Sequence, residues 1–319
     1  MRRGISAINA LLAVDKPCGM TSHDVVSRVR RALGERRVGH AGTLDPDASG
    51  VLVVGVGQAT KLLGMLTLDR KSYRARIEFG SQTTTDDAEG EVIASSAVPS
   101  ELFDADTAAR AVSGLVGELD QMPPAFSAIS VGGKRAYALA REGKEVKLSP
   151  RHVIIHEAGL LSVTGEGTAE SPLVWECDFD VSKGTYIRSI ARDLGLMLGT
   201  HAHLCGLRRT SAGMVEIADC VSLDELAERG RDLMADRVLD PVACLGIATR
   251  AVEVAEIADI TCGRHIPMGL VSLDGVTREP RPGEPIALVW DHALVGVWQR
   301  RSTDLVCSTN FPQAIERVR

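Results

Sequence analysis

The order of apolar and polar positions predicts a chain that mixes strands with helices. Short runs rich in Val, Leu and Ile, bounded by Gly, Pro or Asp, predict strands, whereas apolar residues repeating every three to four positions predict helices. The predicted strands are Leu11–Val14, residues 51–57 ("VLVVGVG"), 71–80 ("KSYRARIEFG"), Arg151–Val163, Pro172–Val181 and 202–213 ("AHLCGLRRTSAG").

One helix has a well-defined predicted start and end. Residues 22–33 place Val25, Val26, Val29, Ala32 and Leu33 on one face, with an N-cap at Thr21 or Ser22 and an end at Gly34. The other predicted helices are 58–66, Asp104–Gly117, a segment ending at Gly143 after a Gly132–Gly133 turn, 184–199 capped by Thr185, and the short helix 222–230.

The pattern of apolar and polar residues changes beyond Ala248. Short apolar runs such as "PIALVW" and "LVGVWQ" alternate there with Gly, Pro and Asp, which predicts a small all-β appendage. We therefore expect a mixed α+β body over residues 1–247 and a compact β-rich domain over residues 248–319.

Composition is typical of a globular protein. Of the 319 residues 45% are hydrophobic, and no stretch approaches the roughly 18–20 apolar residues that a spanning helix needs. The start "MRRGISAINALLAV" superficially resembles a signal peptide, but "DKP" follows where small cleavage-site residues should stand. Seven cysteines without a CxxC pair fit a reduced protein, so we expect a cytoplasmic location without membrane association.

Charge is unevenly distributed along the chain. The net charge of −6 comprises +6 over residues 1–80 (13 Lys or Arg against 7 Asp or Glu), −10 over 81–180 (7 against 17) and −2 over 181–319 (16 against 18). Basic residues gather in 28–37, 70–76 and 183–209. A polyanion could bind such a face. Because helix surfaces are commonly rich in Arg, charge alone leaves a nucleic-acid partner open.

The stretch "GHAGTLDPDASGVL" (residues 39–52) concentrates reactive groups among small residues. Asp45 is the candidate nucleophile or base, because Pro46 fixes the backbone after it and the flanking glycines let a substrate approach. Asp47 is a rival, and both carboxylates could simply be turn residues. A hydrolytic triad of His40, Asp45 and Ser49 is disfavoured, because three members within ten residues of one loop rarely reach one another.

Two further motifs allow other chemistry. On a strand, His201, His203 and Cys205 would share one face and could bind zinc, but no fourth ligand is evident nearby. The segment "VLVVGVGQATK" lacks the P-loop pattern GxxxxGK[ST] and fits a packed strand–helix junction better.

Several motifs in order resemble one known family. The stretch 39–52, "LLAVDKPCGMTSHDVV", "KSYRARIEFG", "MPPAFSAISVGGKRAYALAREG", "SKGTYIRSIARDLG" and "AHLCGLRRTSAG" closely resemble motifs of the TruB family, the bacterial tRNA pseudouridine-55 synthases. The resemblance covers about residues 10–215. Residues 1–10 extend the usual start, "VTGEGTAESP" resembles a longer hairpin loop, and the C-terminal part is only vaguely similar to the family's RNA-binding PUA domain.

The resemblance implies a fold and a reaction. The fold would be an α+β pseudouridine synthase fold with a mixed, mainly antiparallel central sheet flanked by helices and loops. Residues 1–247 would form the catalytic domain, and 248–319 a small β-rich PUA-like domain. The enzyme would isomerise uridine 55 in the TΨC loop of tRNA, without metal or organic cofactor. We expect a monomer with no obligate protein partner.

The resemblance also assigns the central site residues. Asp45 matches the family's nucleophile, which attacks the flipped-out nucleoside at C1′ of the sugar or at C6 of uracil. Arg188 matches the arginine that pairs with this carboxylate. Such a guanidinium favours the ionised form that must attack. Tyr73 matches the tyrosine that stacks on uracil and takes a proton during rearrangement.

Further residues match the family's substrate contacts. Tyr186 matches a second pocket tyrosine, His40 a histidine that fills the space left by the displaced nucleotide, and Leu207 a leucine that walls the uracil pocket. Lys16 matches a lysine near the floor of the site, as support for the loop or as a contact.

Other residues have less specific assignments. We interpret Tyr137 as structural, and Arg208, Arg209 and the arginines of helix 22–33 as phosphate contacts. We expect the acidic segment Asp86–Glu118 to face away from RNA. Two alternatives remain, a synthase for another RNA and a catalytically silent RNA-binding module.

Overall fold

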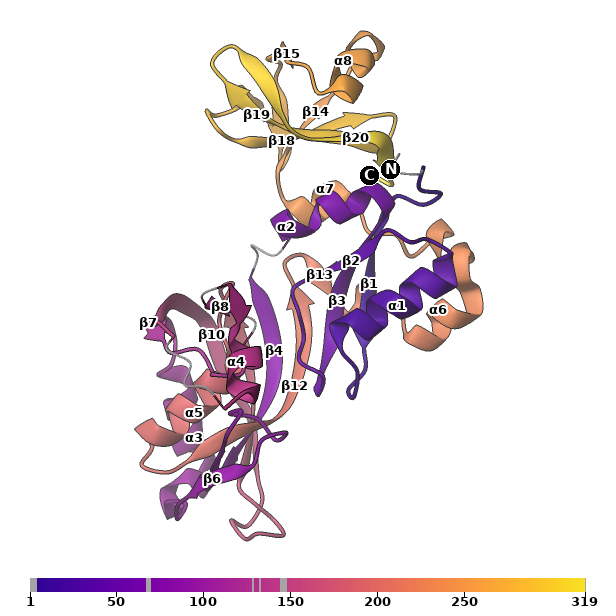
Figure 1. Ribbon diagram of the computed structural model, residues 1–319. Coiled ribbons are helices and arrows are strands. Elements are labelled where there is room, and N and C mark those ends of the chain that lie inside the picture. The colour runs from indigo at the N-terminus through magenta and orange to yellow at the C-terminus, as the bar shows by residue number, and fades with distance from the viewer. Residues whose placement is uncertain (1–4, 67–69, 128, 132, 144–147, 319) are drawn as a thin grey trace. The chain divides into compact units, whose positions relative to one another are not determined.

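The computed structural model describes residues 5–66, 70–127, 129–131, 133–143 and 148–318 (Figure 1). Residues 1–4 of the leader-like start and Gly132 of the predicted Gly-Gly turn lie outside these ranges. The chain forms two compact units. The first contains residues 1–46, 50–68 and 211–319, and the second contains 47–49 and 69–210.

Three strands form the sheet of the first unit's N-terminal half. β1 (Ala10–Lys16) pairs antiparallel with β3 (Ala48–Val56), and β3 pairs antiparallel with β2 (Val38–Ala41). β1 and β3 are almost wholly buried, which explains their continuous apolar runs. The strands predicted over 11–14 and 51–57 are thus confirmed.

Helix α1 (Ser22–Leu33) covers this sheet as its sequence predicts. Thr21 is the N-cap and forms a capping box with Asp24. Gly34 ends the helix in the left-handed conformation, with φ of 62°. The buried stripe of α1 packs on apolar residues of β1 and β3.

The predicted helix 58–66 differs in form. Residues Gly57–Lys61 form a 3₁₀ helix, η1, and only Leu63–Leu66 form a short α-helix, α2. The Thr60 hydroxyl donates to the Gly57 carbonyl 2.8 Å away, which favours the tighter turn. The remaining elements before residue 248 in this unit are β13 (Val215–Glu216), η3 (Ile217–Asp219), α6 (Leu223–Arg229), η4 (Gly230–Ala235) and α7 (Pro241–Leu245).

Residues from Ala248 onward are rich in strands but not all-β. The sheet order is β15-β20-β19-β18-β14-β16-β17, and β14 runs parallel to β18. A 3₁₀ turn, η5 (Val254–Glu256), and helix α8 (Ile257–Cys262) interrupt the strands, since a Glu253–Glu256 capping box starts them and Gly263 ends them. The strands are β14 (Ala248–Ala251), β15 (Ile266–Pro267), β16 (Val271–Leu273), β17 (Val276–Arg278), β18 (Pro285–Trp290), β19 (Ala293–Arg301) and β20 (Asp304–Glu316).

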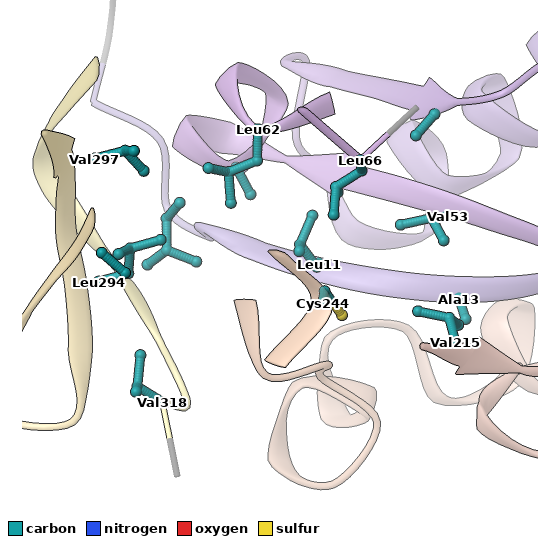
Figure 2. Close-up of a cluster of buried hydrophobic side chains, with 14 of the residues drawn as sticks. Leu11, Ala13, Val53, Leu62, Leu66, Val215, Cys244, Leu294, Val297 and Val318 are labelled. Carbon is teal, nitrogen blue, oxygen red and sulfur yellow. The ribbon is translucent and has the colours of Figure 1, made fainter. Parts of the chain in front are cut away.

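One apolar cluster in the first unit joins residues from both sides of the predicted domain boundary. Leu11, Val53 and Leu62 belong to the same buried cluster as Leu294 and Val297 (Figure 2). The boundary at 247/248 therefore does not separate two compact units in this structure, and the division into two domains stays a prediction.

The second unit is built on a sheet in the order β12-β4-β11-β10-β7, in which the pairs from β4 to β7 are antiparallel. The predicted strands of this region are confirmed. The bounds are β4 (Lys71–Phe79), β7 (Gly117–Gln121), β10 (Arg151–Thr164), β11 (Val174–Val181) and β12 (Ala202–Ala212).

Helices and small hairpins complete the second unit. The predicted helix 104–117 is shorter, because Gly114 ends α3 (Ala105–Ser113) and the chain enters β7 at Gly117. The other elements are β5 (Ser81–Thr83), β6 (Val92–Ser95), η2 (Ser100–Phe103), β8 (Ser130–Val131), β9 (Lys134–Arg135), α4 (Ala136–Arg141) and α5 (Ile187–Met197). Among the described residues, no helix has the length and apolarity needed to cross a membrane.

Candidate active site

The predicted site residues belong to both units. Lys16, His40 and Asp45 lie in the first unit. The second unit holds Tyr73, Tyr186, Arg188 and Leu207. Each group is built by the elements of its own unit.

The backbone before Asp45 is held by helix α1. The Ser22 hydroxyl, 2% exposed as a residue, accepts a hydrogen bond from the Leu44 N–H at 2.9 Å and donates to the Leu44 carbonyl at 3.1 Å. Leu44 is itself buried, so without Ser22 its N–H and carbonyl would lose this hydrogen-bond partner where water cannot replace it. Ser22 thus fixes the residue that precedes Asp45. From the sequence, Ser22 is only a candidate N-cap.

The backbone after Asp45 is held by the end of β1. The Lys16 ammonium group donates to the carbonyls of Pro17, Met20 and Pro46 at 2.9, 2.6 and 2.9 Å. The Gly19 N–H donates to the same Pro46 carbonyl at 3.0 Å. Of the two readings of Lys16, these contacts favour support for the loop. The half-buried Asp45 therefore sits between two fixed residues.

His40 lies on β2, opposite Val54 of β3. Its ring meets the ring of His23 of α1 edge-on, with centroids 6.3 Å apart and the planes at 90°. His40 is half-buried, whereas His23 is exposed. The structure thus places two imidazoles at the start of the loop that carries Asp45.

Arg188 is buried in the first turn of α5, with 8% of its side chain exposed. Its guanidinium donates to the Thr85 carbonyl at 3.0 Å and to the Phe126 carbonyl at 3.1 Å. It also lies 3.3 Å from a carboxylate oxygen of Asp87. These fixed acceptors give the guanidinium one orientation.

The start of the acidic segment Asp86–Glu118, which we expect to face away from RNA, packs against α5. Asp86 and Asp87 turn inward: Asp87 contacts Arg188, and Asp86 lies 2.9 Å from Arg192 on the next turn of α5. Asp86 has a left-handed φ of 60°. Burial raises the pKa of the Asp86 carboxyl, and the Arg192 guanidinium opposes that rise. The one sequence feature that could have drawn attention to Asp86 and Asp87 is that two adjacent acids follow a run of threonines.

Tyr73 lies on the buried face of β4 and is 8% exposed. It pairs in register with Phe179 of β11. Strand alternation puts Arg74 on the opposite, exposed face, 2.9 Å from Asp178. Leu207 is half-buried on β12.

Tyr186, not Thr185, is the N-cap of α5, so the predicted cap is wrong. The Thr185 hydroxyl donates instead to the Ser182 carbonyl at 2.9 Å, closing the turn before the helix. Tyr186 is half-buried, and its backbone is bound by the side chain of Gln121. Sequence reasoning missed Gln121, which carries no recognisable motif of its own.

In the alternative zinc and triad sites, His203 and Ser49 bind other residues. His203 is buried with its Nδ1 3.2 Å from the Ser81 carbonyl, and burial raises the pKa of the Cys205 thiol to about 11, which disfavours a thiolate ligand. Across the described part of the chain, no group of three or more His, Cys, Asp or Glu side chains could hold a metal ion. The Ser49 hydroxyl accepts a hydrogen bond from Arg208 at 3.3 Å.

The arginines expected at phosphates differ in exposure. Arg28 and Arg31 of α1 are exposed, and Arg31 lines an open hollow of about 590 Å³ with Arg30 and Arg36. Arg209 is only 1% exposed, which does not suit a phosphate contact.

Two family models match consecutive parts of the chain. Residues 30–187 match the TruB family pseudouridylate synthase N-terminal domain, and residues 188–243 match the tRNA pseudouridylate synthase B C-terminal domain. The first match contains the loop around Asp45, and the second begins at Arg188.

Curated bacterial relatives are similar over most of their length. A tRNA pseudouridine synthase B of Mycobacteroides abscessus is 49% identical over 261 residues, which are 82% of this chain and 85% of the relative. One from Mycobacterium tuberculosis is 45% identical over 282 residues, which are 88% of this chain and 91% of the relative.

Solved structures share the fold at low identity. A structure of an H/ACA ribonucleoprotein bound to a substrate RNA containing 2′-deoxyuridine matches with a TM-score of 0.67 and 20% identity, covering 97% of this chain and 88% of the other. An archaeal box H/ACA complex matches with a TM-score of 0.65 and 22% identity, covering 94% and 85%. The predicted α+β class with a β-rich C-terminal part is confirmed.

Proposed function

Because the chain belongs to the TruB family of pseudouridylate synthases, we propose that it converts uridine 55 in the TΨC loop of tRNA to pseudouridine. The observation that carries the proposal is the fixed backbone on both sides of Asp45, where Ser22 holds Leu44 and Lys16 holds Pro46. A carboxylate that must meet one atom of a substrate gains from such preorganisation.

Asp45 is the proposed nucleophile. Its carboxylate attacks C1′ of the sugar or C6 of uracil, and the N-glycosidic bond breaks. After the base has turned over, a bond forms between C1′ and C5 and the carboxylate is released. C5 then loses its proton to solvent, and N1 gains one. Arg188 is proposed to pair with the Asp45 carboxylate, and Asp87 holds Arg188 in place.

The target nucleoside is proposed to leave the stacked loop before the reaction. Extrusion costs a few kcal/mol, which stacking on an aromatic ring in the pocket offsets. Tyr73 is the proposed stacking residue, with Tyr186 and Leu207 as further walls. His40 is proposed to occupy the space left in the RNA. Residues 248–319 are proposed to bind RNA as a PUA-like domain.

The test uses the intact chain with an unmodified tRNA transcript that carries tritium at C5 of its uridines. We expect tritium release with EDTA present, and none from a transcript with cytidine at position 55. Release that survives this cytidine substitution supports another uridine as target. Tight binding without any release supports the silent RNA-binding module and overturns the proposal.

A further inference from the structure

A buried side chain binds both backbone groups of Tyr186. Gln121, the last residue of β7, is 1% exposed. Its Oε1 accepts a hydrogen bond from the Tyr186 N–H at 2.8 Å, and its Nε2 donates to the Tyr186 carbonyl at 3.1 Å. The amide thus pairs with the backbone as a neighbouring strand would. We name this arrangement the Gln121 clamp.

The clamp acts at the start of α5. Tyr186 is the N-cap of this helix, and its side chain forms no capping hydrogen bond. The Gln121 clamp therefore fixes a helix start that the usual side-chain cap does not hold. Two residues later the same helix presents the guanidinium of Arg188.

Neighbouring contacts extend the same connection. The Ser189 hydroxyl donates to the Met122 carbonyl at 2.8 Å, and Arg188 donates to the Phe126 carbonyl at 3.1 Å. The segment 121–126 is therefore joined to residues 186–189 at three successive places. A shift of Gln121 would move the helix start and the guanidinium together.

We propose that Gln121 is a positioning residue for turnover, which sets Tyr186 and Arg188 in their working places. The inference rests on the proposed function, because it assumes that these two residues act on the substrate. Without the clamp, both backbone groups of the half-buried Tyr186 lose a partner, and the helix start is free to shift. A displacement of about 1 Å at a reacting group can cost about 100-fold in rate.

The chain offers a matched control in the same unit. The hydroxyl of Thr200, a residue only 4% exposed, donates to the Ala97 carbonyl at 3.1 Å and lies 2.9 Å from the Ser96 hydroxyl. Thr200 follows the C-terminal end of α5, outside the predicted site. Gln121→Met and Thr200→Val each remove two hydrogen bonds and keep the approximate size of the side chain.

The experiment compares Gln121→Met and Thr200→Val with the wild-type chain. We expect Gln121→Met to lower kcat for tritium release by about 10- to 100-fold. Its Kd for tRNA should stay within about threefold of wild type, since binding is spread over many phosphate contacts. Thr200→Val should keep the wild-type kcat even if its Tm falls as much as that of Gln121→Met.

Three results separate the outcomes. Wild-type kcat in Gln121→Met, or an equal loss of kcat in both variants, overturns the positioning role. A wild-type chain that releases no tritium refutes the proposed function instead. If Gln121→Met does not fold, amide exchange in the wild-type chain remains decisive: the Tyr186 N–H should exchange slowly, and exchange as fast as in an exposed loop would contradict the clamp.

Discussion

The ammonium nitrogen of Lys16 lies 2.9 Å from the carbonyl oxygen of Pro46, and the lysine has no exposed surface. A charge is thus kept inside the protein to hold the residue that follows Asp45. Burying an ammonium group is costly unless it is fully hydrogen-bonded, and three carbonyl oxygens meet that need here. The position of Asp45 therefore depends on a residue 29 positions before it.

Replacing this lysine should impair turnover more than binding. Lys16→Met leaves the Pro46 carbonyl with fewer donors and frees the loop, so we expect kcat to fall at least about tenfold. Quenched tritium-release assays at saturating tRNA measure kcat. The control is Lys61→Met, since Lys61 donates to the Asn310 carbonyl at 2.6 Å in the same unit. Equal kcat values for the two variants would contradict the role of Lys16.

Ser22 should matter through its hydroxyl. Ser22→Ala leaves the buried N–H and carbonyl of Leu44 without this partner, which costs about 1–3 kcal/mol of unfolding free energy. We expect a lower Tm together with a lower kcat. Ser27→Ala is the matched control, because Ser27 donates to the His23 carbonyl on the exposed side of the same helix. A normal kcat in Ser22→Ala would show that the loop does not need it.

The two carboxylates of the loop can be distinguished by single substitutions. Asp45→Asn should abolish turnover and keep tRNA affinity within about tenfold, since the carboxylate serves the chemistry rather than most of the binding. Asp47→Asn, at an exposed position, should keep most activity. For each variant, single-turnover kinetics measure the rate of the reaction, and filter binding measures the affinity for tRNA. The reverse pattern would make Asp47 the nucleophile.

The phenol of Tyr73 should be needed for proton transfer rather than for stacking. Tyr73→Phe keeps the ring and removes the hydroxyl, so we expect loss of turnover with tRNA affinity unchanged. Tyr137→Phe, at a residue 43% exposed on α4, is the control and should behave as wild type. Full activity of Tyr73→Phe would show that a group other than the Tyr73 hydroxyl takes the proton.

One acidic transition is expected in the C-terminal sheet. The Arg278 guanidinium beside Glu284 lowers the pKa of that carboxyl from its ordinary 4.5 to about 2. The ion pair therefore contributes stability that is complete above about pH 4.5 and is lost as pH falls towards 2. The Tm difference between wild type and Glu284→Gln should shrink over that range. Glu228→Gln, at an exposed position of α6, should show no such trend.

Local patterns predicted most elements, because their signals are local. Alternation in β4 and the capped, periodic α1 needed no distant information. Element ends were less predictable: Gly114 stopped α3 early, and a hydroxyl bond within the Ser182–Thr185 turn moved the cap of α5 to Tyr186.

The supports of the site could not be predicted in the same way. Asp45 stood out by its setting, whereas Ser22 and Gln121 act on backbone groups 22 and 65 positions away. A serine at a helix start and a glutamine at a strand end look ordinary in sequence. The inward turn of Asp86 and Asp87 likewise depends on arginines of α5 that lie about 100 positions later.

The apolar cluster of Figure 2 gives residues 248–319 a structural role besides the proposed RNA binding. Leu294, Val297 and Ile315 complete the core beneath β1 and β3, the strands whose ends carry Lys16 and the loop of Asp45. A chain that ends near residue 247 would lose this support together with any RNA contact made by residues 248–319. Substitutions in residues 248–319 should therefore affect the position of Asp45, the proposed nucleophile, even where the substituted residue does not contact the substrate.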